Sequence, residues 1–375
     1  MESKWRVPVA IVAASVALAA STGAAAATVS VGVADTGVAP NLGGQLLPGW
    51  NFLAKNTDTS DWVWHGTFVA GMVQSASQGH AAIVPLRICN LTNVSNSVPP
   101  ATCNAAAAGN AIKWAAQHGI RIVNDSINFS GANTTLKSAI TANPNVLVVA
   151  AAGNLKVNID SKPQYPCSFR LPNVICVTAT TTGDVLWTKA DIGQTVQLAA
   201  PGVNVAGQTP WTQQHFPADL SAGTNCELQL RMKGSANPLT ITGMTAQTNA
   251  TIAQWSGSLT AYKTGTWPFP TPLQGQNGVS VSFTGASGLT IQNQVAQCQG
   301  PTTQPFTSSG GSFSAATVSG VAAMLEDQFP QATTAQIVSA ILNGATTDVT
   351  PAGQISGNRE LNVAGAVQQL QKLFP

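Results

Sequence analysis

Four short motifs place chemically complementary side chains where predicted strands end or predicted helices begin. Asp35 lies in Val-Ala-Asp-Thr-Gly, and His65 opens His-Gly-Thr-Phe-Val-Ala-Gly. Asn154 ends Ala-Ala-Ala-Gly-Asn, and Ser312 lies in Gly-Gly-Ser-Phe-Ser-Ala. Because ligands of open α/β sheets bind at the carboxyl ends of the strands, we expect these four side chains to meet in one site.

The four residue types are those that acyl transfer requires. A serine hydroxyl is a weak nucleophile until a neighbouring base takes its proton, and His65 is the base that its motif places for Ser312. A carboxylate, here Asp35, must fix the imidazole tautomer and stabilise the imidazolium. Asn154 and the backbone N–H of Ser312 could then donate to the oxyanion, where the start of a helix adds partial positive charge.

Each of these residues also has an ordinary structural interpretation. Aspartate and Gly-Asn pairs are frequent in turns, and serine is a favoured helix N-cap. Four such residues in one chain favour a single active site. The other histidines match no motif and are expected to be structural or exposed: His80, His118 and His215. Asp61 is expected to be a surface or loop charge.

The motifs resemble those of the subtilisin family of serine peptidases, in which Asp, His and Ser follow in this order. A trypsin-like enzyme would place His before Asp, and an α/β-hydrolase would need Gly-x-Ser-x-Gly. Further matches are Tyr-Pro at 165–166, Asn-Val-Ile-Cys-Val-Thr-Ala at 173–179 and Ala-Pro-Gly at 200–202. The resemblance implies a secreted or periplasmic serine endopeptidase that acts on protein or peptide substrates. It also makes calcium possible, although no ligands can be identified and we predict no metal site.

The resemblance further implies two segments that flank the substrate, with these residues: Ser126, Ile127, Asn128, Ala151, Ala152 and Gly153. In the family, two glycines follow Ser-Leu, whereas Asn128 and Phe129 stand here. Their side chains would narrow or reshape the pocket for the residue before the scissile bond. The specificity of the family therefore does not transfer to this chain.

The serine motif also departs from the family pattern. Gly311 stands where Thr is usual, and Ala316 stands where Pro is usual, so Ser312 would be less firmly held in place. These changes leave a second interpretation open, in which the chain is a catalytically impaired binding or scaffold protein with the same fold.

Short β-branched runs alternate with helical stretches up to about residue 202, which predicts a parallel sheet with crossover helices. The expected strands are residues 29–34, 82–88, 120–124, 146–151, 174–178 and 196–199. The expected helices are residues 66–75, 105–118, 134–142, 312–328, 334–342 and 362–373. Within residues 203–309, alternation of period two, as in Leu-Thr-Ile-Thr-Gly at 239–243, predicts antiparallel β structure.

We therefore expect an α/β, subtilisin-like three-layer fold with a mostly parallel central sheet and helices on both faces. Its peptidase domain would comprise residues 28–202 and 310–375, interrupted by a β-rich insert of unknown role at 203–309. Residues 1–27 have the pattern of a signal peptide, with Lys4 and Arg6 before an apolar run and Ala25 and Ala27 at its end. The alternative is an uncleaved membrane anchor, which alone would bring the chain to a membrane.

Composition supports a folded chain without nucleic-acid partners. Hydrophobic residues make up 44% of the chain and charged residues only 8%, with a formal net charge of +2. That charge is too small, and its lysines and arginines are too scattered, to match a phosphate backbone. We expect a monomer.

Six cysteines follow the predicted signal, as is typical of an oxidising compartment. Nearest-neighbour pairing would give Cys89–Cys103, Cys167–Cys176 and Cys226–Cys298, and buried free thiols are the alternative. No Cys-x-x-Cys occurs and the histidines are dispersed, which argues against a zinc site.

Overall fold

The structure is a computed structural model that describes residues 29–40, 42–61, 63–91, 101–214, 220, 224–245, 247–276 and 279–375. The predicted signal peptide or membrane anchor, and His215, lie outside these residues. In the part of the chain that is described, no helix is long and apolar enough to cross a membrane.

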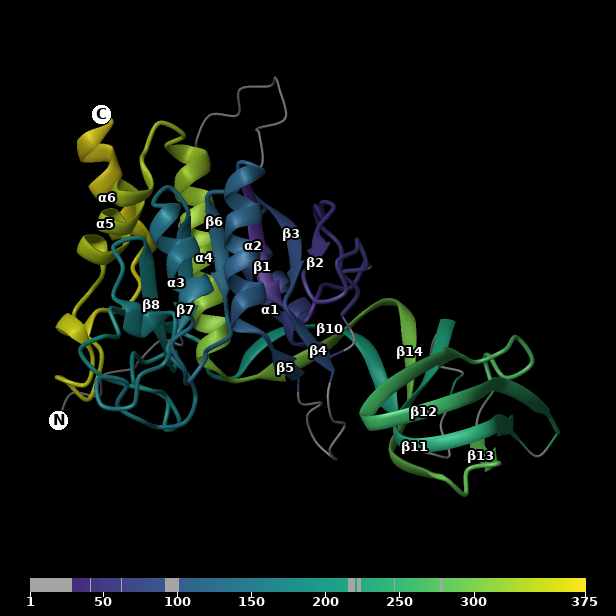
Figure 1. Ribbon diagram of the computed structural model, residues 1–375. Helices are drawn as coiled ribbons and strands as arrows, with labels where there is room; N and C mark the ends of the chain where they lie inside the picture. The colour runs from purple at the N-terminus through teal and green to yellow at the C-terminus, as the bar shows by residue number, and fades with distance from the viewer. Residues whose placement is uncertain are drawn as a thin grey trace, which may run out of the picture.

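A seven-stranded sheet forms the centre of the α/β part (Figure 1). Its strand order is β2-β3-β1-β6-β7-β8-β9, and all neighbours pair in parallel. The strands are β1 (Val29–Asp35), β2 (Trp50–Asn51), β3 (Ala81–Arg87), β6 (Ile122–Asp125), β7 (Leu147–Ala151), β8 (Val174–Thr180) and β9 (Leu198–Pro201). Six of them correspond to expected strands. β2 was not expected, since two residues are too few to show a pattern.

Helices cover both faces of this sheet, as expected. They are α1 (His65–Ala76), α2 (Ala105–Gln117), α3 (Thr134–Ala142), α4 (Gly311–Gln328), α5 (Thr334–Gly344) and α6 (Val363–Leu373). Alternate residues of each strand point to opposite faces, so Val33 packs with α1 and α4 while Ala34 packs with α2 and α3. Two short 3₁₀ helices, η1 (Cys167–Phe169) and η2 (Ser356–Asn358), complete the α/β part.

Polar N-caps fix where several helices begin. Asn133 accepts a hydrogen bond from the backbone N–H of Leu136 at the start of α3, as its position before the helix suggests. Asn104 and Asn362 cap α2 and α6 in the same way, and Thr333 forms a capping box with Gln336 at α5. Such side chains satisfy backbone donors that the helix itself cannot.

The residues between β9 and α4 form an antiparallel sheet that extends away from the α/β part (Figure 1). Its strands are β10 (Val205–Gln214), β11 (Thr224–Met244), β12 (Asn249–Pro268), β13 (Ser280–Thr284) and β14 (Leu289–Ser308). The alternation at Leu239 and Ile241 is real, because both side chains are fully buried in a separate core there. The β-rich insert therefore has its own hydrophobic core.

Three disulfides cross-link the chain with the nearest-neighbour pairing. Cys89–Cys103 joins the short antiparallel strands β4 (Cys89–Leu91) and β5 (Ala101–Cys103), and Cys167–Cys176 joins η1 to β8. Cys226–Cys298 joins β11 to β14 in the insert. No free cysteine remains.

The disulfide in the insert gives a stability prediction. Cys226 and Cys298 are 72 residues apart, so the cross-link restricts the unfolded insert. This restriction should raise the free energy of the unfolded insert, and so its free energy of unfolding, by about 4 kcal/mol. Replacing both by Ala should lower the melting temperature of the insert, which the fluorescence of Trp255 and Trp267 would follow. Far-ultraviolet circular dichroism of the helices should change little. A single unchanged transition for both signals would contradict the prediction.

Candidate active site

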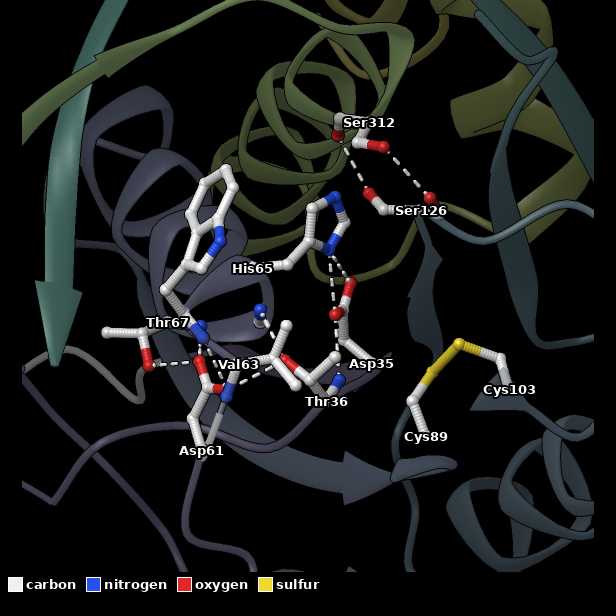
Figure 2. Close-up of polar contacts among 12 residues, drawn as sticks. Asp35, Thr36, Asp61, Val63, His65, Thr67, Cys89, Cys103, Ser126 and Ser312 are labelled. Atoms are coloured by element: carbon white, nitrogen blue, oxygen red, sulfur yellow. Dashed lines mark hydrogen bonds and ion pairs between the residues drawn. A yellow bond between two sulfur atoms is a disulfide. The ribbon is translucent and has the colours of Figure 1, made fainter. Parts of the chain in front are cut away.

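The expected site residues come from neighbouring elements at one edge of the sheet. Asp35 is the last residue of β1, and His65 is the first residue of α1. Ser312 lies in the first turn of α4, and Asn154 follows β7 after a short turn. Figure 2 shows His65 between Asp35 and Ser312.

Asp35 and His65 form a close pair. The Nδ1 atom of His65 lies 2.8 Å from Oδ1 and 2.9 Å from Oδ2 of Asp35, which is fully buried. A carboxylate can only accept, so Nδ1 carries the proton and Nε2 is left as the base. The backbone N–H of Thr36 also donates to Oδ1 of Asp35, at 2.7 Å, and this fixes the carboxylate.

The approach of α1 to β1 explains the glycine after His65. A Cβ atom on Gly66 would lie 2.1 Å from the carbonyl oxygen of Gly37, in the turn that follows Asp35. Gly37 itself has a φ of 111°, which favours glycine. The glycines in both motifs thus allow the two segments to meet closely enough for the Asp35–His65 hydrogen bonds.

The carboxylates around His65 raise its pKa. Burial lowers its pKa, but the charge and hydrogen bond of Asp35, together with the charge of Asp61, more than offset this effect. The pKa of His65 therefore lies above its ordinary value of 6.5. An imidazole with a raised pKa accepts a proton from a nucleophile more readily.

The hydroxyl of Ser312 is held by Ser126 rather than by His65. It donates to the carbonyl oxygen of Ser126 at 3.0 Å, and the Ser126 hydroxyl donates to the carbonyl oxygen of Ser312 at 2.7 Å (Figure 2). The expected Ser312–His65 hydrogen bond is thus not made among the described residues. In many enzymes the catalytic hydrogen bonds tighten only when substrate is bound.

The Asn154 side chain is oriented by the start of α4. Its Oδ1 atom accepts a hydrogen bond from the backbone N–H of Gly311 at 2.8 Å. Since only the oxygen of an amide can accept, the amide nitrogen is the end that remains to donate. Asn154 is exposed, so its amide N–H groups are accessible beside the N-terminus of α4.

The two expected substrate-binding segments also come together. Ala151 ends β7, and the buried Ala152 and Gly153 follow it. Ser126 directly follows β6. A Cβ atom on Gly153 would lie 2.9 Å from Nδ2 of Asn128. The Asn128 side chain therefore lies where these segments approach each other.

Neighbouring contacts hold Asn128 and Phe129 in place, and Ile127 packs against the core on the α2 and α3 face. Nδ2 of Asn128 donates to Oε1 of Gln164 at 2.8 Å. The backbone of Phe129 exchanges two hydrogen bonds of 2.8 Å with that of Tyr165. Asn128 and Phe129, where the family has two glycines, therefore add ordered side-chain atoms after β6.

The two other described histidines have structural partners. His80 lies 2.6 Å from Oδ2 of Asp327, and His118 stacks on Trp114. Asp61 lies in a loop as expected, but the prediction of a surface charge is wrong, because Asp61 is fully buried and accepts hydrogen bonds from residues beside the site. The sequence signal for a role of Asp61 was its position four residues before His65. Spacing along the chain does not show whether a side chain is buried.

A second buried carboxylate, Asp125, was also missed. It ends β6, where it pairs with Ala150 of β7, and the preceding residue Asn124 pairs with Val33 of β1. Neither of its carboxylate oxygens makes a hydrogen bond of good geometry among the described residues, although the backbone N–H of Ile127 lies near enough to favour the charged form. Burial raises the pKa of Asp125 to about 8, the backbone N–H of Ile127 opposes the shift, and the charge of Asp35 adds to it.

The described residues do not provide a cluster of metal-binding side chains. No three of their His, Cys, Asp or Glu residues gather where they could hold one ion.

The raised pKa of Asp125 makes stability depend on pH. The folded protein keeps this proton up to about pH 8, whereas the unfolded chain loses it near pH 3.8, so folding takes up a proton between these values. The contribution of the protonated carboxyl to stability should fall as the pH rises through this window. In Asp125→Asn, the melting temperature relative to wild type should therefore rise by about 5 °C between pH 4 and pH 8. A difference that stays constant with pH would contradict this assignment.

Comparison with known proteins agrees with the fold and the motifs. The model of the subtilase family matches residues 26–362. The chain is 30% identical over 200 residues to thermitase of Thermoactinomyces vulgaris, covering 51% of this chain and 67% of thermitase. It is 30% identical over 190 residues to subtilisin DY of Bacillus licheniformis, covering 49% of this chain and 68% of that protein.

A crystal structure of a cold-adapted subtilisin-like serine proteinase has the same fold. Its TM-score is 0.55 at 20% sequence identity, with 89% of this chain and 88% of that chain covered. The match to the family model over most of the chain shows that it belongs to the subtilase family of serine peptidases.

Proposed function

We propose that this chain is a secreted serine endopeptidase that hydrolyses peptide bonds through an acyl-enzyme. The observation that carries the proposal is the pair of short Asp35–His65 hydrogen bonds, 2.8 and 2.9 Å, beside the helix start that holds Ser312. This pair leaves Nε2 of His65 as a base on the side of the nucleophile. Family membership supports a protein or peptide as the substrate.

In the acylation step, the Ser312 hydroxyl leaves the Ser126 carbonyl and transfers its proton to Nε2 of His65. Its oxygen forms a bond to the carbonyl carbon of the substrate, and the carbonyl electron pair moves to the oxygen. Asn154 and the backbone N–H of Ser312 donate to this oxyanion. His65 then gives the proton to the amine nitrogen as the C–N bond breaks.

In the deacylation step, water gives a proton to His65 and attacks the acyl carbon. The ester bond to Ser312 breaks, and His65 returns the proton to the serine oxygen. Asp35 holds His65 and stabilises the imidazolium in both steps. The same groups therefore serve both steps, with His65 alternating between base and acid.

The three disulfides support the proposed location outside the cytoplasm, where oxidised cysteines persist. The substrate would lie between the two segments at residues 126–128 and 151–153. Asn128, held by Gln164 at 2.8 Å, would make the pocket before the scissile bond narrower and more polar than two glycines would.

One observation favours a second candidate, a binding or scaffold protein with impaired catalysis. The Ser312 hydroxyl is bonded to the Ser126 carbonyl, and Gly311 and Ala316 depart from the family pattern. If the serine cannot leave this contact, His65 cannot activate it. The two candidates therefore differ in the reactivity of Ser312.

Labelling with a fluorophosphonate separates these candidates. We expect the purified protein to be labelled on Ser312, and we expect Ser312→Ala and His65→Ala to abolish labelling. Ser309→Ala is the matched control, because Ser309 is on the adjoining segment and bonds to Asn204 instead. Folded wild-type protein that remains unlabelled would refute the enzyme.

Asn154→Ala tests the oxyanion assignment. We expect kcat for peptide hydrolysis to fall by about 10²–10³-fold with little change in KM, because the donor acts mainly on the oxyanion. The variant should still react with the fluorophosphonate, although more slowly. A raised KM with an unchanged kcat would assign Asn154 to substrate binding instead.

A further inference from the structure

Asp61 is a fully buried carboxylate that connects the two segments carrying Asp35 and His65. Its Oδ1 atom accepts from Oγ1 of Thr36, the residue after Asp35, at 2.8 Å. The same oxygen accepts from the backbone N–H groups of Val63 and Trp64, both at 2.9 Å. One oxygen thus contacts both the turn after β1 and the turn before α1 (Figure 2).

The other oxygen of Asp61 holds the first turn of α1. Oδ2 accepts from the backbone N–H of Thr67 at 2.8 Å and from its hydroxyl at 2.6 Å. Thr36 adds a second link, because its hydroxyl accepts from the backbone N–H of Gly66 at 2.9 Å. His65 therefore lies within a segment whose backbone is held on both sides by Asp61 and Thr36.

The residue just before His65 has an unfavourable backbone conformation. Trp64 has a φ of 104° and a ψ of −28°, in a region that a bulky side chain rarely adopts. Such strain costs on the order of 1–3 kcal/mol and persists only where surrounding contacts enforce it. The hydrogen bond from the Trp64 N–H to Asp61 is one such contact.

We propose that Asp61 is a positioning residue that holds His65 against Asp35 by fixing the strained turn at Trp64 and tying it to Thr36. This inference rests on the proposed function. Asp61 does not touch the substrate in this scheme. It acts through the backbone on both sides of His65 and through its negative charge.

The charge effect gives a readout that a purely structural role would not change. Burial lowers the pKa of His65, the charge and hydrogen bond of Asp35 raise it, and the charge of Asp61 raises it further. Removal of the Asp61 charge should therefore lower the pKa of His65. The acidic limb of the pH profile of kcat/KM should move to lower pH with it.

The main test compares Asp61→Asn in the wild-type background and in the Trp64→Gly background. In the wild-type background we expect kcat to fall by about 10–100-fold with KM little changed, since a small displacement of His65 affects the reaction more than binding. Glycine adopts a φ near 104° without strain. In the Trp64→Gly background, Asp61→Asn should therefore lower kcat by a factor several-fold smaller. An equal loss in both backgrounds would refute the role of the strained turn.

The matched control is Asp58→Asn, which removes an aspartate from the same loop. Its side chain is 54% exposed and lies 3.7 Å from Arg87, so kcat and the His65 pKa should stay at their wild-type values. If Asp61→Asn fails to fold, Thr36→Val removes the link between Asp61 and Gly66, and it should lower kcat in the same direction. A Thr36→Val variant with wild-type kcat would contradict the proposal.

An NMR titration of His65 distinguishes failure of this inference from failure of the proposed function. If the wild type neither hydrolyses peptides nor reacts with a fluorophosphonate, the proposed function fails, yet the titration still tests Asp61. If the wild type is active but Asp61→Asn keeps its kcat and its His65 pKa, only the present inference is refuted.

Discussion

The parallel pairing of β1 with β6, and of β6 with β7, is the constraint on which the rest of the site depends. Val33 pairs with Asn124, and Asp125 pairs with Ala150, so the three strands end at nearly the same level. Asp35 therefore leaves the sheet beside the segment that begins at Ser126. The turn that carries Asn154 follows β7, the next strand of the sheet. A shift of one residue in any of these pairs would turn its side chains to the opposite face.

Helix α4 depends on the same edge, because polar groups fasten it to the sheet. Ser319 donates to Oδ1 of Asn124 at 3.0 Å, and Nδ2 of Asn124 donates to the Ser126 hydroxyl at 2.8 Å. Ser126 in turn bonds to Ser312. This buried chain of hydrogen bonds fixes the depth and rotation of a largely buried helix, and so fixes where the nucleophile lies.

Local sequence patterns predicted the long buried strands, most helix starts and the order of the chemical groups. They succeeded where a pattern depends on neighbouring residues alone, as for the helix at residues 134–142 or at Leu239 and Ile241 in the insert. The cysteine pairs followed from nearest-neighbour order along the chain, and the structure contains them.

Other features depend on contacts between distant segments, which spacing does not report. Asp61 looked like a surface charge because nothing local shows that Thr36, 25 residues away, donates to it. Asp125 is buried only because β1 and β7 flank its strand. The hydroxyl of Ser312 reaches a carbonyl oxygen 186 residues away. The motifs therefore identified the reacting groups, while the fold determines how each is held.

A crystal structure with a bound peptide boronic acid would test the central claim most directly, because such a compound forms a tetrahedral adduct with an activated serine. The account predicts a covalent bond from Oγ of Ser312 to boron, with Nε2 of His65 and Nδ2 of Asn154 in hydrogen-bond contact with the adduct. The Ser312 hydroxyl would then have left the Ser126 carbonyl. A bound inhibitor with no bond to Ser312, and the serine still on Ser126, would contradict the account.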